Sequence, residues 1–341
     1  MKRLFVLFAF LLVSCAVFAQ DDEPQSEGTL LIVPRLDLDP AYTVDGWSFD
    51  LGSTSLYTLL EGNLTRNLSF SICNHWFAFN TGFDDAVALY ENTWRAYECN
   101  WVDWANLTYK MGNFFISAGK DYIHVANFEI EEFDYDSHWQ MNSFLWNNFQ
   151  VYQWGGRIGW QSEDEDLTLS LQATTDPLMY RPFNSPHPQD YAYTFNAFYE
   201  GEALSLMGSV THSGSWGWIG ALGGKIALSD ALSLTADITL CRMVRSGSLR
   251  MDITLSDQLE LAGKLGYEKI GVTDWDDVLG SGHLFGGVAC NWYPLRDSHD
   301  LRVHLMAAPA IYFHRSGDTV RTPSELYFSA GATYFFEFNL F

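Results

Sequence analysis

Hydrophobic and polar residues alternate one by one along most of this chain. In residues 248–268, SLRMDITLSDQLELAGKLGYE, leucine, isoleucine and methionine alternate with charged, polar and small residues. A period of two residues is typical of a β-strand with two unlike faces, and Ser-Asp-Gln at 256–258 predicts a tight turn between two strands. The same period recurs at 67–77, 166–174, 190–199, 232–240 and 300–312, whereas helix-like spacing is scarce. The sequence therefore predicts an all-β fold.

Short and longer connections separate the predicted strands in turn. Counting through them gives about sixteen strands, with short turns after even-numbered strands and longer loops after odd-numbered ones. The first longer loop is expected at residues 39–47. An even number of antiparallel strands with short periplasmic turns and long extracellular loops is typical of a bacterial outer-membrane β-barrel. We therefore predict a transmembrane antiparallel β-barrel.

Charged residues and one histidine fall on the strand face opposite the apolar one. They are Arg157, Lys225, Asp237, Arg250, Asp252, Glu260, Lys264, Glu268, Arg302 and His304. Burying so many charges in a dry core would be very costly. A wide barrel suits both faces, because lipid covers the apolar face, water fills the lumen and closure leaves no bare strand edge in the bilayer. We therefore predict that these residues line the lumen.

The lumen charges allow more than one arrangement. Arg250, Asp252, Glu260 and Lys264 are expected to pair across one hairpin, as opposite charges on neighbouring strands do. Arg157, Lys225 and Arg302 either form a sparse basic track opposite an acidic loop or are scattered along the wall.

Composition narrows the class of protein further. The 341 residues are 48% hydrophobic and 16% aromatic, yet mean hydropathy is only -0.07, which fits alternation rather than apolar blocks. A net charge of -23 excludes a nucleic-acid partner on electrostatic grounds. No two cysteines stand as CxxC, so we expect no zinc site. We also expect no other metal and no cofactor. Cys73 and Cys99 either form a disulfide or remain free thiols.

The N-terminus reads as an export signal. Lys2 and Arg3 precede an apolar run, and VFA before Gln20 is a small-residue cleavage site, so residues 1–19 are predicted to be a signal peptide. LVSC at 12–15 also resembles a lipoprotein cleavage box. Residues 20–28 would then be a short mobile segment and residues 29–341 the barrel. After residue 19 there is no apolar run of about 18 residues, the length expected of a membrane helix.

The longest predicted outer loop, residues 122–148, is acidic. It carries Glu129, Glu131, Glu132, Asp134 and Asp136. Carboxylates at a narrow point of a pore attract cations and repel anions. We predict that this loop folds inward as a constriction with a weak cation preference. The other interpretation is a solvated surface loop.

Two segments carry a family resemblance. LTYKMGNFFISAGKDYI and NNFQVYQWGGRIGW, within residues 100–175, resemble outer-membrane porins of the phosphate-selective porin O/P type, including general porin relatives. The resemblance implies a barrel that passes small solutes passively, commonly as a homotrimer. Phosphate selectivity in that family depends on basic pore residues, of which this chain has few. The aromatic C-terminus, Phe341, resembles the tail that the barrel-assembly machinery reads.

Taken together, these features predict a function. We expect a passive porin for small hydrophilic solutes or ions in the outer membrane of a diderm (Gram-negative type) bacterium. The alternative is a plugged or narrow barrel that acts as a binding or adhesion surface. An enzyme is not expected, because GxSxG and HExxH are absent and His212 and Ser213 should point to opposite faces.

Overall fold

The computed structural model describes residues 27–51, 54–78, 102–132, 141–147, 151–177, 191–214, 217–242, 244–270, 282–313 and 324–340. Within these residues the chain forms one antiparallel sheet of 18 strand segments and two helical turns, α3 (Phe128–Glu131) and α4 (Phe144–Asn147). The strand segments are β1 (Glu27–Thr43), β2 (Gly46–Asp50), β3 (Ser55–Thr65), β4 (Leu68–Ala78), β5 (Val102–Met111), β6 (Phe114–Tyr122), β7 (Tyr152–Gln161), β8 (Leu167–Thr175), β9 (Tyr191–Glu200), β10 (Leu204–Ser213), β11 (Gly217–Ser229), β12 (Leu232–Cys241), β13 (Val244–Ser256), β14 (Leu259–Ile270), β15 (Gly282–Trp292), β16 (Leu301–Phe313), β17 (Glu325–Tyr334) and β18 (Phe336–Asn339).

Two barrel strands are each interrupted once. β2 and β3 pair one after the other with β1, and β17 and β18 do the same along its other edge. The 18 segments therefore form 16 barrel strands, which confirms the predicted strand number.

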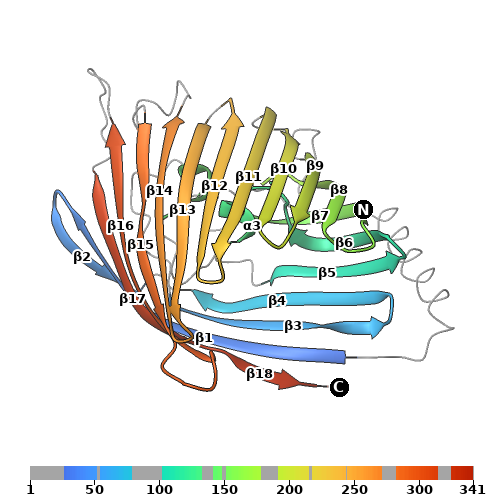
Figure 1. Cartoon of the computed structure of the whole chain (residues 1–341), viewed down its shortest axis with the longest axis horizontal. Helices are drawn as coiled ribbons and strands as arrows, with labels where there is room; N and C mark the ends of the chain where they lie inside the picture. Colours follow the sequence, from blue (N-terminus) through green and yellow to red (C-terminus); the bar gives the residue numbers. More distant parts are fainter. Residues whose placement is uncertain are drawn as a thin grey trace.

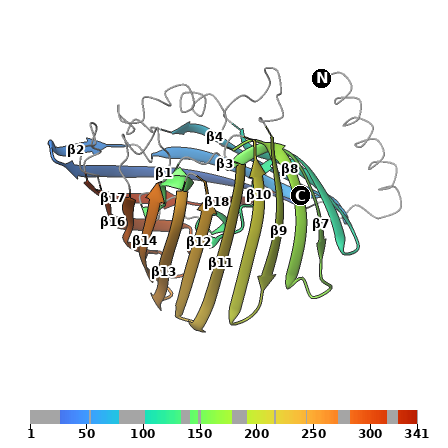
Figure 2. The same cartoon turned by 90° about the horizontal axis from the view of Figure 1, so that it is seen from above.

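The sheet closes on itself between its first and last strands. β18 lies beside β1, and the Leu340 N–H donates to the Gly28 carbonyl at 2.8 Å. The strands wrap around a central space in Figures 1 and 2. The predicted closed, antiparallel barrel is thus confirmed, and no edge is left between β1 and β18 to expose unpaired amides.

Short turns join the strands at one rim, as predicted. The links between β3 and β4, β5 and β6, β11 and β12, and β13 and β14 are each two residues long. At the opposite rim, the expected loop at 39–47 is wrong. β1 runs on to Thr43 and pairs with β2, with Thr43 opposite Gly46, so this connection is a hairpin that projects beside the barrel in Figure 1.

The two faces of the wall differ as the alternation predicts. Leu249 on β13 lies opposite Leu265 on β14, and these side chains are 66% and 63% exposed on the outside. Their neighbours Arg250 and Lys264, also opposite each other, point inward. A soluble barrel would not leave such a continuous apolar outer face in water, whereas a bilayer covers it.

No helix in the described residues is long and apolar enough to span a bilayer. Cys73 is a buried, free thiol, while its suggested partner Cys99 lies outside the described residues, as does Phe341.

Candidate functional site on the inner wall

Part of the long connection between β6 and β7 packs against the inside of the barrel. We call residues 123–132 and 141–147 the inner segment. Its helical turn α3 lies inside the wall in Figure 1. Asn127 caps α3, accepting from the Ile130 N–H at 3.0 Å, and its amide group donates to Thr239 Oγ1 on β12 at 2.8 Å.

Asp237 on β12 holds the first turn of α3. Its Oδ1 accepts from the Phe128 N–H at 2.8 Å and its Oδ2 accepts from the Glu129 N–H at 3.1 Å. These amides have no partner within so short a helical turn, so a carboxylate satisfies both at once. Gly223 on β11 leaves the required room, because a Cβ there would lie 2.7 Å from Asp237 Oδ1 and 2.8 Å from the Phe128 ring.

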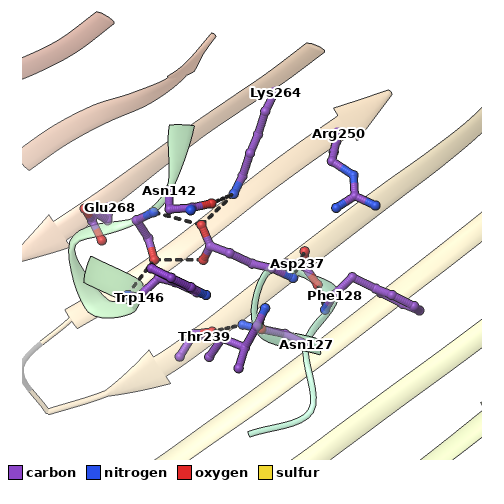
Figure 3. A network of polar contacts seen from close by, with 12 residues as sticks. Asn127, Phe128, Asn142, Trp146, Asp237, Thr239, Arg250, Lys264 and Glu268 are labelled. Atoms are coloured by element: carbon purple, nitrogen blue, oxygen red, sulfur yellow. Dashed lines mark hydrogen bonds and ion pairs between the residues drawn. The ribbon is translucent and has the colours of Figure 1, made fainter. Parts of the chain in front are cut away.

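Glu129 joins the two halves of the inner segment to the wall. Its carboxylate accepts from the Ser143 N–H at 2.8 Å and from the Ser143 hydroxyl at 2.7 Å. Lys264 Nζ on β14 lies 2.6 Å from Glu129 Oε1 and donates to Asn142 Oδ1 at 2.9 Å. Figure 3 shows Lys264 pointing from the wall toward Asn142. The Glu129 side chain is therefore buried by these contacts and is not exposed to the lumen.

Glu132 binds two cations of the wall. Lys225 Nζ on β11 and Arg250 Nη2 on β13 each lie 2.9 Å from its carboxylate. Arg250 also donates through Nε to Asp252 Oδ2 on its own strand at 2.8 Å. Lys225 thus contacts the acidic segment directly instead of standing opposite it across the lumen.

The predicted cross-strand charge pairs are wrong. The two-residue turn at 257–258, together with a register shift between Thr254 and Ser256, places Arg250 opposite Lys264, and these are like charges. Their acidic partners come from the inner segment and, for Arg250, from Asp252 on the same strand. Glu260 instead accepts from the Tyr293 hydroxyl at 3.0 Å.

Glu131 contacts His124, which lies just after β6 at the start of the inner segment. His124 Nδ1 lies 3.2 Å from Glu131 Oε2, and Arg157 Nη1 on β7 contacts the other ring nitrogen, Nε2. Gln172 on β8 fixes this region, accepting from the His124 N–H at 3.1 Å and donating to the Tyr122 carbonyl at 2.7 Å.

Apolar contacts inside the barrel complete the attachment. Ile130, Leu145 and Trp146 of the inner segment pack in one buried cluster with Ile219 and Ala221 of β11. Phe128 packs with Met207 of β10, and Met141 with Ala289 and Met306. These inward apolar positions were not predicted, although Ile219 and Ala221 share the predicted polar face with Lys225 and so interrupt its pattern.

The remaining predicted lumen residues also have close neighbours. Glu268 lies 2.6 Å from His283 Nδ1, His304 Nε2 lies 2.8 Å from Asp37 Oδ1, and the Arg302 guanidinium stands over the Phe335 ring. Asp134 and Asp136 lie outside the described residues. No group of three or more metal-binding side chains occurs in the described part of the chain.

His212 and Ser213 do not form a catalytic pair. The His212 ring packs edge-on against the exposed Trp218, with 4.8 Å between ring centroids. The Ser213 hydroxyl is buried and donates to Asp176 Oδ2 at 2.7 Å. A nucleophile and its base must lie within hydrogen-bonding reach of each other, and these two side chains face apart.

Comparison with known proteins gives matches of structure alone. No protein-family model and no curated protein sequence matches this chain. Among solved structures, the outer membrane channel DcaP of Acinetobacter baumannii has a TM-score of 0.58 at 11% identity, covering 91% of this chain and 97% of that one. Salmonella typhi OmpF, solved with daunomycin, has a TM-score of 0.57 at 13% identity, covering 92% and 98%. Vibrio cholerae OmpT, in a trimer form, has a TM-score of 0.53 at 10% identity, covering 91% and 99%. The chain therefore has the 16-stranded barrel fold found in outer-membrane porins and channels.

Proposed function

We propose that this protein is a passive outer-membrane channel for small hydrophilic solutes or ions. The observation that carries the proposal is the contrast between the two faces of one closed wall. Large apolar side chains such as Leu249 and Leu265 cover the outside, while Arg157, Lys225 and Arg250 point inside. Charged side chains on the inner face of a bilayer-spanning barrel favour a water-filled path.

The inner segment is the proposed constriction. It occupies part of the barrel interior and contacts β10 to β16 through Asp237, Lys264, Glu132 and its apolar clusters. A segment held at so many points would narrow the lumen by its bulk. The specific phosphate-selective porin O/P type is not part of the proposal, because the wall cations Lys225, Arg250 and Lys264 are already bound to carboxylates.

The proposed source of the weak cation preference is a set of wall carboxylates, not the carboxylates of the inner segment. Glu129 and Glu132 are bound to wall cations and contribute little net field to a passing ion. Two other wall carboxylates accept hydrogen bonds from neutral side chains. Glu61 accepts from the Ser71 hydroxyl at 2.5 Å, and Asp121 accepts from the Asn106 amide at 3.0 Å. These residues would provide a weak preference for cations.

A narrow barrel that serves as a binding or adhesion surface is the second candidate. It is favoured by the burial of inward side chains such as Glu268 and His304, which have no exposed surface. Both candidates place the chain in the outer membrane of a diderm bacterium. A homotrimer, export through residues 1–19 and recognition of the last strand by the barrel-assembly machinery belong to the same proposal.

Single-channel recording in a planar lipid bilayer tests the function. The purified, folded protein should give discrete open-channel steps, and its reversal potential in a KCl gradient should show a weak cation preference. A barrel closed by its inner segment would give almost no current. That result would overturn the channel proposal and favour the binding barrel.

The charge-neutral double variant Glu129→Gln/Lys264→Met separates bulk from charge. It removes one anion and one cation together, so the net charge of the lumen is unchanged. If the inner segment constricts the pore by its bulk, conductance should rise while the reversal potential stays the same. An unchanged conductance in a variant shown to fold would remove this anchor from the proposed constriction.

A further inference from the structure

Three side chains, from α3, β7 and the residues just after β6, form a chain of contacts at the start of the inner segment. Glu131 on α3 contacts His124 Nδ1, and Arg157 on β7 contacts His124 Nε2. A guanidinium has donors only, so His124 Nε2 must act as the acceptor and carry no proton. The single ring proton then sits on Nδ1 and is donated to Glu131. The arrangement therefore requires a neutral imidazole.

A small cavity lies next to this chain of contacts. It is lined by Ser117, Gly119, Asp121, Gln153, Arg157 and Thr174 on the inner face of β6, β7 and β8. Gly119 and Gly155 lie opposite each other in its floor, so no side chain fills it. Among the described residues, Arg157 Nε and Thr174 Oγ1 have no hydrogen-bond partner. Arg157, with an unused Nε donor, and Asp121 therefore line the same cavity.

The geometry points to a proton-controlled switch of Arg157, which rests on the proposed channel function. When Nε2 of His124 takes up a proton, it becomes a donor and the ring becomes a cation, so Arg157 loses its acceptor and is repelled. The charged imidazole stays with Glu131. The guanidinium turns toward Asp121 across the cavity and neutralises a carboxylate of the lumen.

Three side chains face the His124 imidazole. Glu131 faces it from α3, Tyr122 from β6 with ring centroids 5.7 Å apart, and Arg157 from β7. Gln172 from β8 contacts its backbone and does not titrate. Imidazole is the side chain that normally changes charge between pH 5 and 8. Lower pH should thus add positive charge to the lumen and weaken its cation preference.

Two measurements test the switch. In bilayer recordings of the wild-type protein, the cation-to-anion permeability ratio should fall by about twofold between pH 8 and pH 5. His124→Gln keeps an acceptor for Arg157 and a donor for Glu131 but does not titrate, so the fall should shrink. His299→Gln, at an exposed position outside the strands, is the matched control and should behave as wild type. Equal pH dependence in the wild type and His124→Gln would overturn the switch, even if both conduct.

A second readout does not depend on conduction. Imidazole nitrogen NMR of the folded protein, assigned by comparison with His124→Gln, should show the Nδ1–H form of His124 at neutral pH. The Nε2–H form at neutral pH would refute the inference. Absence of any current would reject the channel proposal alone, and the NMR result would still decide whether His124 holds Arg157.

Discussion

Lys264 and Glu129 form an ion pair inside the barrel, with 2.6 Å between Nζ and Oε1 and only 5% of either side chain exposed. The two residues lie 135 positions apart in the chain, one on β14 and one on α3. Lys264 also holds Asn142, and Glu129 also holds Ser143. This pair therefore ties both halves of the inner segment to the wall.

Lys264→Met should destabilise the attachment of the inner segment. It leaves the Glu129 carboxylate buried without its cation, which typically costs about 3–5 kcal/mol. Proteolysis of the folded protein should then cut within residues 123–147 faster than in the wild type. Lys269→Met, an exposed position on the same strand, should leave the cleavage rate unchanged. The double variant with Glu129→Gln should recover only part of the loss, because no unpaired charge remains but the anchoring ion pair is still absent.

Asp237→Asn tests whether Asp237 anchors the first turn of α3. An asparagine keeps one acceptor oxygen, but its NH₂ group would face one of the two N–H groups of Phe128 and Glu129 that Asp237 now accepts. Losing one such charge-assisted hydrogen bond should cost about 1.5–3 kcal/mol. Hydrogen exchange of those two amides should accelerate. Asp257→Asn in an exposed turn is the control, and equal exchange in both variants would count against this role of Asp237.

The membrane position of the wall can be tested on a single strand. Leu249 and Leu255 both lie on β13 and are exposed outward, but Leu255 stands next to the turn at 257–258. Leu249→Arg places a charge deep in the bilayer and should cost about 2–4 kcal/mol, whereas Leu255→Arg near the interface should cost about 0–1 kcal/mol. Urea unfolding from lipid vesicles measures both. Equal costs would mean that bilayer depth does not differ between the two positions.

The overall fold was predictable from the alternation of apolar and polar residues along the chain. A two-residue period fixes which side chains share a face, and short turns such as 257–258 join neighbouring strands, so the closed barrel and its 16 strands follow from local pattern. The hairpin of β1 and β2 was missed because Pro40 and Gly46 suggest a loop. Pairing with β17 on one side and β2 on the other nevertheless keeps β1 extended to Thr43.

The site was only partly predictable. The sequence indicates that Glu129 and Glu132 are acidic loop residues and that Lys225, Arg250 and Lys264 point inward. It does not show that these two sets meet, because the contacts join residues 93 to 135 positions apart and depend on how the inner segment lies. The placement of Arg250 opposite Lys264 could have indicated the contact, because like charges that face each other require an acidic partner from another part of the chain.

Gly331→Ala should disrupt the seam where the barrel closes. Gly331 on β17 lies between Asp37 on β1 and His304 on β16, directly opposite each of them. Those two side chains meet across it, with His304 Nε2 2.8 Å from Asp37 Oδ1. A Cβ at Gly331 would lie 1.7 Å from Asp37 Oδ1 and 2.6 Å from His304 Cε1, so the buried pair would have to separate. The yield of folded barrel, read from heat-dependent migration on SDS gels, should fall sharply. Gly263→Ala on β14, where a new Cβ meets nothing within 4 Å, should fold like the wild type. Equal yields for the two variants would show that the Asp37–His304 contact is not needed at the seam.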